Sequence, residues 1–349
     1  MTQKPDEMNM NAKASREFKP GVGLDIGTMN IVSARQAENK VVTMRVRDAF
    51  LDLDTDAKKT LRMSKIDFVE KDGALIIIGD SALNMANLFK REVRRPLSRG
   101  IISPGELDAQ QVLALLVRHV LEVPTVTDEH CFYSVPASPI DDPDQDVVYH
   151  QEIFRKILTE HGYSPHPLNE ALAIIYSQCA AENFSGLAVS MGSGMCNVAL
   201  AYQTVLGMSF SVARGGDWID QHASKAVGST AARMCALKEK GLDLLKPNKD
   251  RAEEALTLYI RSLIRYCLES IATQFRAVQA TLDLPEPIPF VVSGGTSKVG
   301  GFLEVFKAEF EDVSRKGFPI QISEIRPAKD PMTAVAEGLL VLAMEEHAE

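Results

Sequence analysis

The sequence of 349 residues has no apolar run that could span a bilayer, which takes about 18 or more consecutive apolar residues. Its first nineteen residues also lack the apolar segment of a signal peptide and the apolar face of a strong membrane anchor. We therefore expect a flexible tail over residues 1–19, no transmembrane segment and a cytoplasmic location.

Paired cysteines and a surplus of basic residues are also missing. The five cysteines (Cys131, Cys179, Cys196, Cys235 and Cys267) are scattered, odd in number and never form C-x-x-C, which favours reduced thiols in a core over a disulfide framework. The formal net charge of −9 excludes a general nucleic-acid binder, because such a protein needs basic side chains to neutralise phosphates.

The composition supports an ordinary globular protein. The length suits two domains, and the 45% hydrophobic content is enough for two cores. An acidic run at Asp141, Asp142, Asp144 and Asp146 precedes a helical pattern, and it favours a solvated helix N-terminus over a metal site.

One stretch organises the rest of the chain: GVGLDIGTMNIVSAR, residues 21–35. Its apolar runs on either side of Gly27 predict a strand, a tight turn and a second strand. Such a turn can hold a phosphate, because glycine lets the backbone N–H groups approach an anion, and Asp25 can hold a magnesium ion. Alone, the pattern also fits a charged turn in an ordinary hairpin.

A second stretch repeats this arrangement. Residues 187–202, LAVSMGSGMCNVALAY, place Gly192 and Gly194 between two apolar runs. A third glycine turn lies in VVSGGTSKVGG, residues 291–301, between an apolar strand and a helical pattern. Two similar hairpins predict two similar α/β halves that close on a nucleotide.

The order of these motifs resembles the actin and heat-shock-chaperone ATPase superfamily. The three turns are similar to its phosphate-1, phosphate-2 and adenosine motifs. Within the superfamily, RRPLSRGIIS (residues 94–103) and KDPMTAVAEGLLVLA (residues 329–343) resemble segments of the MreB-type bacterial actins. The resemblance covers nearly the whole chain after residue 20.

The resemblance implies a two-lobed fold made of duplicated ribonuclease-H-like α/β domains, with a nucleotide cleft between the lobes. We expect lobe I over residues 20–181 and 328–349, with a small inserted subdomain at about 39–105, and lobe II over residues 182–327.

The resemblance also implies the site residues and its cofactors, ATP or GTP with Mg²⁺. Asp25 would hold the metal, and Glu170, an approximate match to a family position, would orient the attacking water. The residues expected to contact nucleotide come from the three turns, from a GG-[DE] helix start and from a lysine-glutamate helix: Gly27, Thr28, Met29, Asn30, Gly192, Ser193, Gly194, Gly215, Gly216, Asp217, Lys238, Glu239, Gly294, Gly295 and Thr296.

One departure from the family pattern bears on catalysis. Phosphate-2 usually begins with an aspartate, whereas Ser190 stands there in this chain. Nucleotide binding is therefore expected, with slow hydrolysis. The leading interpretation is an ATP-dependent, filament-forming cytoskeletal or cell-shape protein whose protein partners are unknown. The alternatives are a nucleotide-binding scaffold or regulator that does not polymerise, and a chaperone-like ATPase without a peptide-binding domain.

Overall fold

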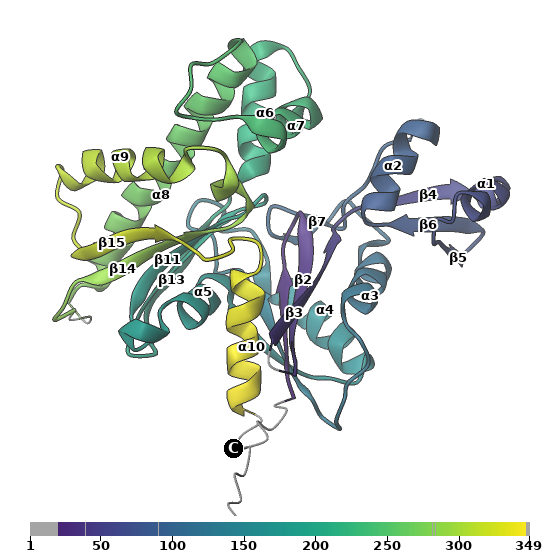
Figure 1. Cartoon of the computed structure of the whole chain (residues 1–349), viewed down its shortest axis with the longest axis horizontal. Coiled ribbons are helices and arrows are strands. Elements are labelled where there is room, and N and C mark those ends of the chain that lie inside the picture. The colour runs from purple at the N-terminus through teal and green to yellow at the C-terminus, as the bar shows by residue number, and fades with distance from the viewer. Residues whose placement is uncertain (1–19, 39, 90, 281, 283, 347–349) are drawn as a thin grey trace, which may run out of the picture.

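Two five-stranded sheets with the same strand pattern organise the computed structural model, which describes residues 20–346 apart from 39, 90, 281 and 283 (Figure 1). The strand order is β10-β9-β1-β2-β3 in the first sheet and β13-β12-β11-β14-β15 in the second. The predicted tail, residues 1–19, lies outside the described residues.

The first sheet consists of β1 Val22–Ile26, β2 Asn30–Ala37, β3 Lys40–Arg47, β9 His130–Val135 and β10 Ser164–Asn169. The second consists of β11 Gly186–Met191, β12 Cys196–Tyr202, β13 Val205–Val212, β14 Ile288–Ser293 and β15 Ile322–Pro327. In each sheet the central strand pairs antiparallel with the next strand of a hairpin and parallel with a later strand. The two halves predicted from the repeated hairpins are therefore present.

Each sheet has its own hydrophobic core. In the first lobe, α3 Ala109–Val120 and α4 Val147–Glu160 pack against β1, β2 and β9. In the second lobe the covering helices are α6 Gly216–Val227, α7 Ala231–Gly241, α8 Arg251–Val278 and α9 Phe302–Ser314. The longest helix, α8, has an apolar stripe at helical spacing from Leu256 to Phe275, and the residues of this stripe are all buried.

Two helices join the lobes. Helix α5 Glu170–Gln178 and helix α10 Ala334–Glu346 share a core with strands of the second sheet, and α10 lies between the sheets in Figure 1. They cross so closely that a Cβ on Gly338 would lie 1.8 Å from the carbonyl oxygen of Ala173. A side chain at Gly338 would therefore force the two linking helices apart.

A small mixed subdomain extends from the first lobe at the right of Figure 1. It contains the sheet of β4 Phe50–Asp54, β6 Ala74–Ile78 and β5 Val69–Lys71, with helices α1 Lys58–Met63 and α2 Asp80–Phe89. Strand β3, which we expected within this insertion, instead continues the β1–β2 hairpin as an edge strand of the first sheet. The turn after β2 is short enough to fold the chain directly back on itself.

His166 lies in β10, where its Nε2 is 2.8 Å from Nδ1 of His130. Two prolines in this strand obscured the β pattern, but β10 is an edge strand, which tolerates residues without an N–H donor.

The cysteine prediction holds, since all five thiols are free. Across residues 20–346 as described, none of the helices combines the length and the apolar character that crossing a membrane requires.

Candidate functional site

A cavity of about 370 Å³ lies between the two lobes, and all three predicted glycine turns line it. Of the residues predicted to contact nucleotide or to act in catalysis, Gly215 alone does not reach the cavity wall. Residues from parts of the chain as distant as Asp25, Glu170 and Gly295 therefore meet in one place. The volume lies within the range of about 300–1,000 Å³ that is usual for small-molecule sites.

The two hairpin turns have the same backbone geometry. The N–H of Gly27 donates to the carbonyl of Asn30 at 3.0 Å, and the N–H of Gly192 donates to the carbonyl of Met195 at 3.0 Å. In each turn the bond joins residues three positions apart and closes the hairpin, so the two turns repeat the same arrangement.

The turns approach each other closely. A Cβ on Gly194 would lie 2.3 Å from Oγ1 of Thr28 and 2.4 Å from the backbone nitrogen of Gly100. Thr28 Oγ1 accepts a hydrogen bond from that same N–H at 3.0 Å. Only glycine fits at position 194 while the lobes hold this arrangement.

Two half-buried carboxyl groups line the cavity. Asp25 Oδ1 accepts a hydrogen bond from the hydroxyl of Ser134 at 3.0 Å, and Glu170 Oε2 accepts one from the amide of Asn197 at 2.7 Å. Burial raises the pKa of Asp25 to about 7, against the lowering effect of Ser134. Burial and the neighbouring Asp25 raise the pKa of Glu170 to about 8. In the absence of a ligand, Asp25 and Glu170 are therefore both partly protonated near neutral pH.

Ser190, which stands where the family has an aspartate, is almost fully buried beside this pair. Its hydroxyl bonds to Glu170 and lowers the pKa of that carboxyl, in opposition to burial. Glu170 thus supplies a second carboxyl group near Asp25, and Ser190 acts on it as a neutral hydrogen-bond partner.

The carboxyl pair fits a magnesium ion only if other ligands complete the coordination. Among the described residues, no group of three or more His, Cys, Asp or Glu side chains could hold a metal by itself. Magnesium typically binds one or two carboxylates together with water and phosphate oxygens. Two neighbouring carboxyl groups in the wall of a cavity of this size match that pattern.

The N–H groups at the GG-[DE] helix start already have protein partners. The N–H of Gly216 donates to the carbonyl of Gly192 at 2.9 Å, and that of Asp217 donates to the carbonyl of Ser193 at 2.8 Å. The start of α6 therefore holds the second glycine turn in place.

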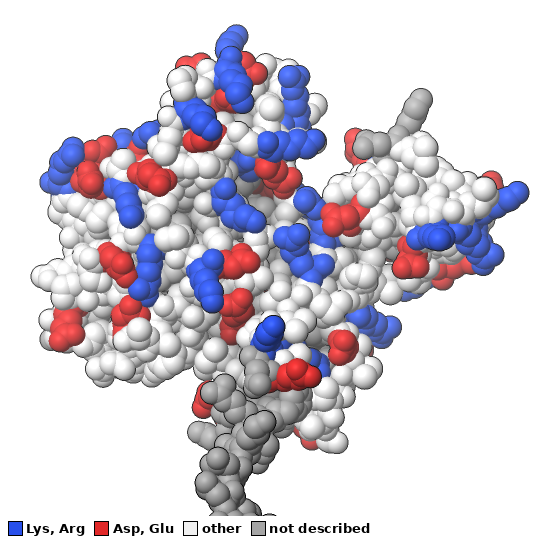
Figure 2. Space-filling model, in the orientation of Figure 1, with Lys and Arg blue, Asp and Glu red and all other residues white. Residues whose placement is uncertain are grey.

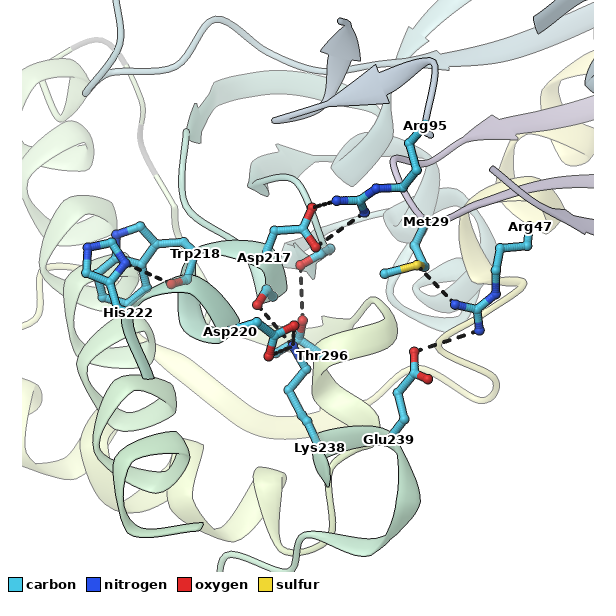
Figure 3. A network of polar contacts seen from close by, with 12 residues as sticks. Met29, Arg47, Arg95, Asp217, Trp218, Asp220, His222, Lys238, Glu239 and Thr296 are labelled. Carbon is cyan, nitrogen blue, oxygen red and sulfur yellow. Dashed lines mark hydrogen bonds and ion pairs between the residues drawn. The ribbon is translucent and has the colours of Figure 1, made fainter. Parts of the chain in front are cut away.

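Asp217 lines the cavity and also has a protein partner. Its carboxylate accepts two hydrogen bonds from Arg95, at 3.3 and 2.8 Å, across the gap between the lobes (Figure 3). Burial lowers the pKa of Arg95, but the negative charges of Asp217 and Asp48 outweigh it, so the pKa is raised. The pair joins the RRPLSRG segment to the start of α6.

Lys238 and Glu239 both line the cavity, but each already has a protein partner (Figure 3). The ammonium of Lys238 lies 2.7 Å from a carboxylate oxygen of Asp220 and 3.0 Å from the carbonyl of Gly216. Glu239 forms a 3.8 Å ion pair with Arg47 of β3 at the mouth of the cavity. Contact of either side chain with a nucleotide stays a prediction.

Sequence reasoning missed several lining residues, including Arg45, Arg47, Cys235 and Lys298. Lys298 belongs to the third glycine stretch, so its motif could have indicated it. Arg45 and Arg47 carry no local signal, because they reach the cavity only through the pairing of β3 with β2.

Comparisons with solved structures find the same two-lobed architecture. The chain is similar to MamK in a double helical filament, with 20% identity, a TM-score of 0.71 and coverage of 92% of this chain and 98% of that one. It is similar to MreB5 of Spiroplasma citri bound to ADP, with 15% identity, a TM-score of 0.62 and coverage of 94% and 97%. It is also similar to the ethanolamine utilization protein EutJ from Carboxydothermus hydrogenoformans, with 14% identity, a TM-score of 0.51 and coverage of 92% and 89%.

These matches confirm the predicted two-lobed, actin-like fold. A comparison with curated proteins finds no match. The sequence model of the Volactin family matches residues 21–343, which is nearly the whole chain, and the chain therefore belongs to the Volactin family.

Proposed function

We propose that this chain is an actin-like protein that binds a magnesium nucleotide between its lobes, assembles into filaments and hydrolyses the nucleotide slowly. The observation that carries the proposal is the single cavity lined by three glycine turns from both lobes. Because one ligand would contact both lobes there, it would favour their closure.

The chain's own residues suit phosphate binding. The turns at Gly27 and Gly192 place backbone close to an anion, and Thr28 and Ser193 add hydroxyls at the cavity wall. Asp25, with Glu170 beside it, would hold the magnesium ion, and the ion would neutralise charge on the phosphates. The third turn, with Gly294, Gly295 and Thr296, would lie under the base and sugar.

Slow hydrolysis is supported by the second glycine turn, which offers one carboxyl group fewer than the actin-superfamily pattern. The position that holds an aspartate in the family pattern offers only the hydroxyl of Ser190. Binding is therefore favoured over turnover.

Assembly is supported by the nature of the similar structures. One is a MamK double helical filament, and a second MamK structure is a non-polymerising mutant bound to AMPPNP. A contact repeated head to tail without closing gives an open filament. The second candidate function is a nucleotide-binding scaffold or regulator that stays monomeric. Ser190 in place of the phosphate-2 aspartate favours it, because the site then has one carboxyl group fewer for turnover.

Sedimentation with and without nucleotide tests the proposal. We expect the wild type to pellet in magnesium with ATP or GTP and to remain in solution without nucleotide. Asp25→Ala should weaken nucleotide binding in magnesium by about a hundredfold, the scale of losing one charge contact at a reaction centre, and by much less in a chelator. Nucleotide binding without pelleting would favour the scaffold, and no binding at all would refute both functions.

A further inference from the structure

A second cavity lies in the first lobe, outside the nucleotide cleft, and has a volume of about 470 Å³. The short hairpin of β7 Leu97–Ser98 and β8 Ile101–Ile102 forms one wall, and the beginnings of α3 and α4 form the others. We call it the α3–α4 cavity. Its size is that of a small-molecule site, and Ile101, Ile102 and Leu107 contribute apolar surface.

Two side chains of the wall have buried polar atoms without partners. His150 is fully buried, and neither of its ring nitrogens has a hydrogen-bond partner among the described residues. Gln145 donates from Nε2 to the carbonyl of Arg99 at 2.7 Å, which fixes its amide, while its buried Oε1 has no partner in the described part of the chain. Buried polar atoms in folded proteins are normally hydrogen-bonded, so this pair indicates a missing ligand.

The protonation state of His150 restricts the chemical class of that ligand. Burial lowers the pKa of the ring to about 4, so the imidazole is neutral and offers one donor and one acceptor. The unpaired atoms of His150 and Gln145 therefore offer two acceptors and one donor. A ligand rich in N–H groups therefore fits better than a carboxylate or a phosphate.

The charges around the cavity favour the same class of ligand. Arg99 forms a 2.9 Å ion pair with Asp142, so the positive charge of Arg99 is already neutralised. Asp144 and Asp146 add two exposed carboxylates at the wall, and Asp146 also caps α4 by accepting from the N–H groups of Val148 and Tyr149. The wall is thus net negative and would repel an anion.

We propose that the α3–α4 cavity binds a small organic ammonium ion with an apolar body. The ammonium group donates to Gln145 Oε1 and lies near Asp144, while the apolar body contacts Ile101 and Leu107. The site is independent of the nucleotide cleft in its chemistry.

The two cavities are linked through one loop. Arg99 and Ile101 line the α3–α4 cavity, and Gly100 between them lines the nucleotide cavity and donates to Thr28. An ammonium ion that orders this loop would also stabilise the first glycine turn. This consequence rests on the proposed nucleotide function, whereas the binding site itself does not.

Calorimetric titration of the full chain with phenethylamine, without nucleotide, tests the site. We expect saturable binding and shifts of the methyl resonances of Ile101 and Ile102, but no binding of 3-phenylpropanoate, which has a carboxylate in place of the amine. Gln145→Met should weaken phenethylamine binding by about tenfold through the loss of one charge-assisted hydrogen bond. The matched control is Gln111→Met, at an exposed position of α3 outside the cavity wall, and it should bind like the wild type.

The double variant Asp144→Asn with Asp146→Asn removes the local charge but keeps a good helix cap, so it should fold and bind more weakly. Absence of saturable phenethylamine binding would overturn the proposal. So would equal binding of 3-phenylpropanoate, or wild-type affinity in both the Gln145 variant and the double variant. Because no nucleotide is present, these outcomes do not depend on the nucleotide site.

Discussion

At the scale of single residues, the half-buried pair Asp25 and Glu170 makes the stability of the nucleotide-free protein depend on pH. Their pKa values of about 7 and about 8 lie well above those of carboxyl groups in unfolded chains, about 3.9 to 4.3. Between these limits the folded state binds more protons than the unfolded state. The free energy of unfolding therefore falls as pH rises through this window and levels off above about pH 8.

We expect urea unfolding to show this fall between about pH 5.5 and about pH 8.5. Glu170→Gln should reduce the slope of the fall, because an amide does not titrate. The amide oxygen can still accept a hydrogen bond from Asn197, so the variant should fold. The control is Glu160→Gln at the end of α4, where the side chain is 60% exposed. If the free energy of unfolding of Glu170→Gln changed with pH in the same way as that of the wild type, the raised pKa of Glu170 would be contradicted.

At the scale of elements, the contact between the two hairpin turns depends on Gly194. Alanine there would place its Cβ 2.3 Å from Thr28 Oγ1, closer than real side-chain carbons approach such an atom. We expect Gly194→Ala to fold but to hold the lobes apart, since its backbone angles need no glycine. Small-angle scattering should give a larger radius of gyration, and nucleotide affinity should fall by at least about tenfold.

Gly105→Ala is the matched control for this variant, because a Cβ at Gly105 meets no atom within 4 Å. It should leave both the scattering curve and the nucleotide affinity unchanged. A Gly194→Ala protein as compact as the wild type would show that the turns do not control closure.

The ion pair between Arg95 and Asp217 is a second contact between elements of different lobes. The Arg95 side chain is 32% exposed and also faces Asp48, a buried carboxyl whose Oδ2 accepts from the N–H of Leu97 at 3.2 Å. Arg95→Ala would leave two acidic groups without their shared cation. We expect it to lower the free energy of unfolding by about 2 kcal/mol, less than for a fully buried pair and more than for an exposed one.

Urea unfolding measures this loss against Arg91→Ala, which breaks an exposed pair with Asp54 at 3.2 Å. Exposed pairs contribute about 0–1 kcal/mol, so the control should change little. Similar losses in the two variants would mean that Arg95 is not a structural link between the lobes.

These elements also show how far the sequence could predict the structure. The hairpins were predicted because glycine turns between apolar runs are local signals. The ion pair of Asp217 was not, because Arg95 lies 122 positions away and nothing near either residue specifies the other. The ion pair of Lys238 was missed for the same reason, since Asp220, which binds its ammonium, is on another helix.

At the scale of the whole molecule, charge bears on assembly. The net charge is −9, and on the face shown in Figure 2 acidic and basic side chains are interspersed without a large area of one sign. Subunits of equal net charge repel one another over long distances, while contacts at the interface act over short ones. Salt screens the first much more than the second.

We therefore expect the critical concentration for assembly in magnesium nucleotide to fall as ionic strength rises from about 0.01 M to about 0.15 M, because the screening length drops from about 30 Å to about 8 Å. Light scattering across a series of protein concentrations measures it. A nucleotide-free series at each salt concentration is the control, since salt alone should not produce filaments. A critical concentration that rises with salt would mean that complementary charges dominate the subunit contact, and scattering that stays flat throughout would favour a monomeric nucleotide-binding scaffold.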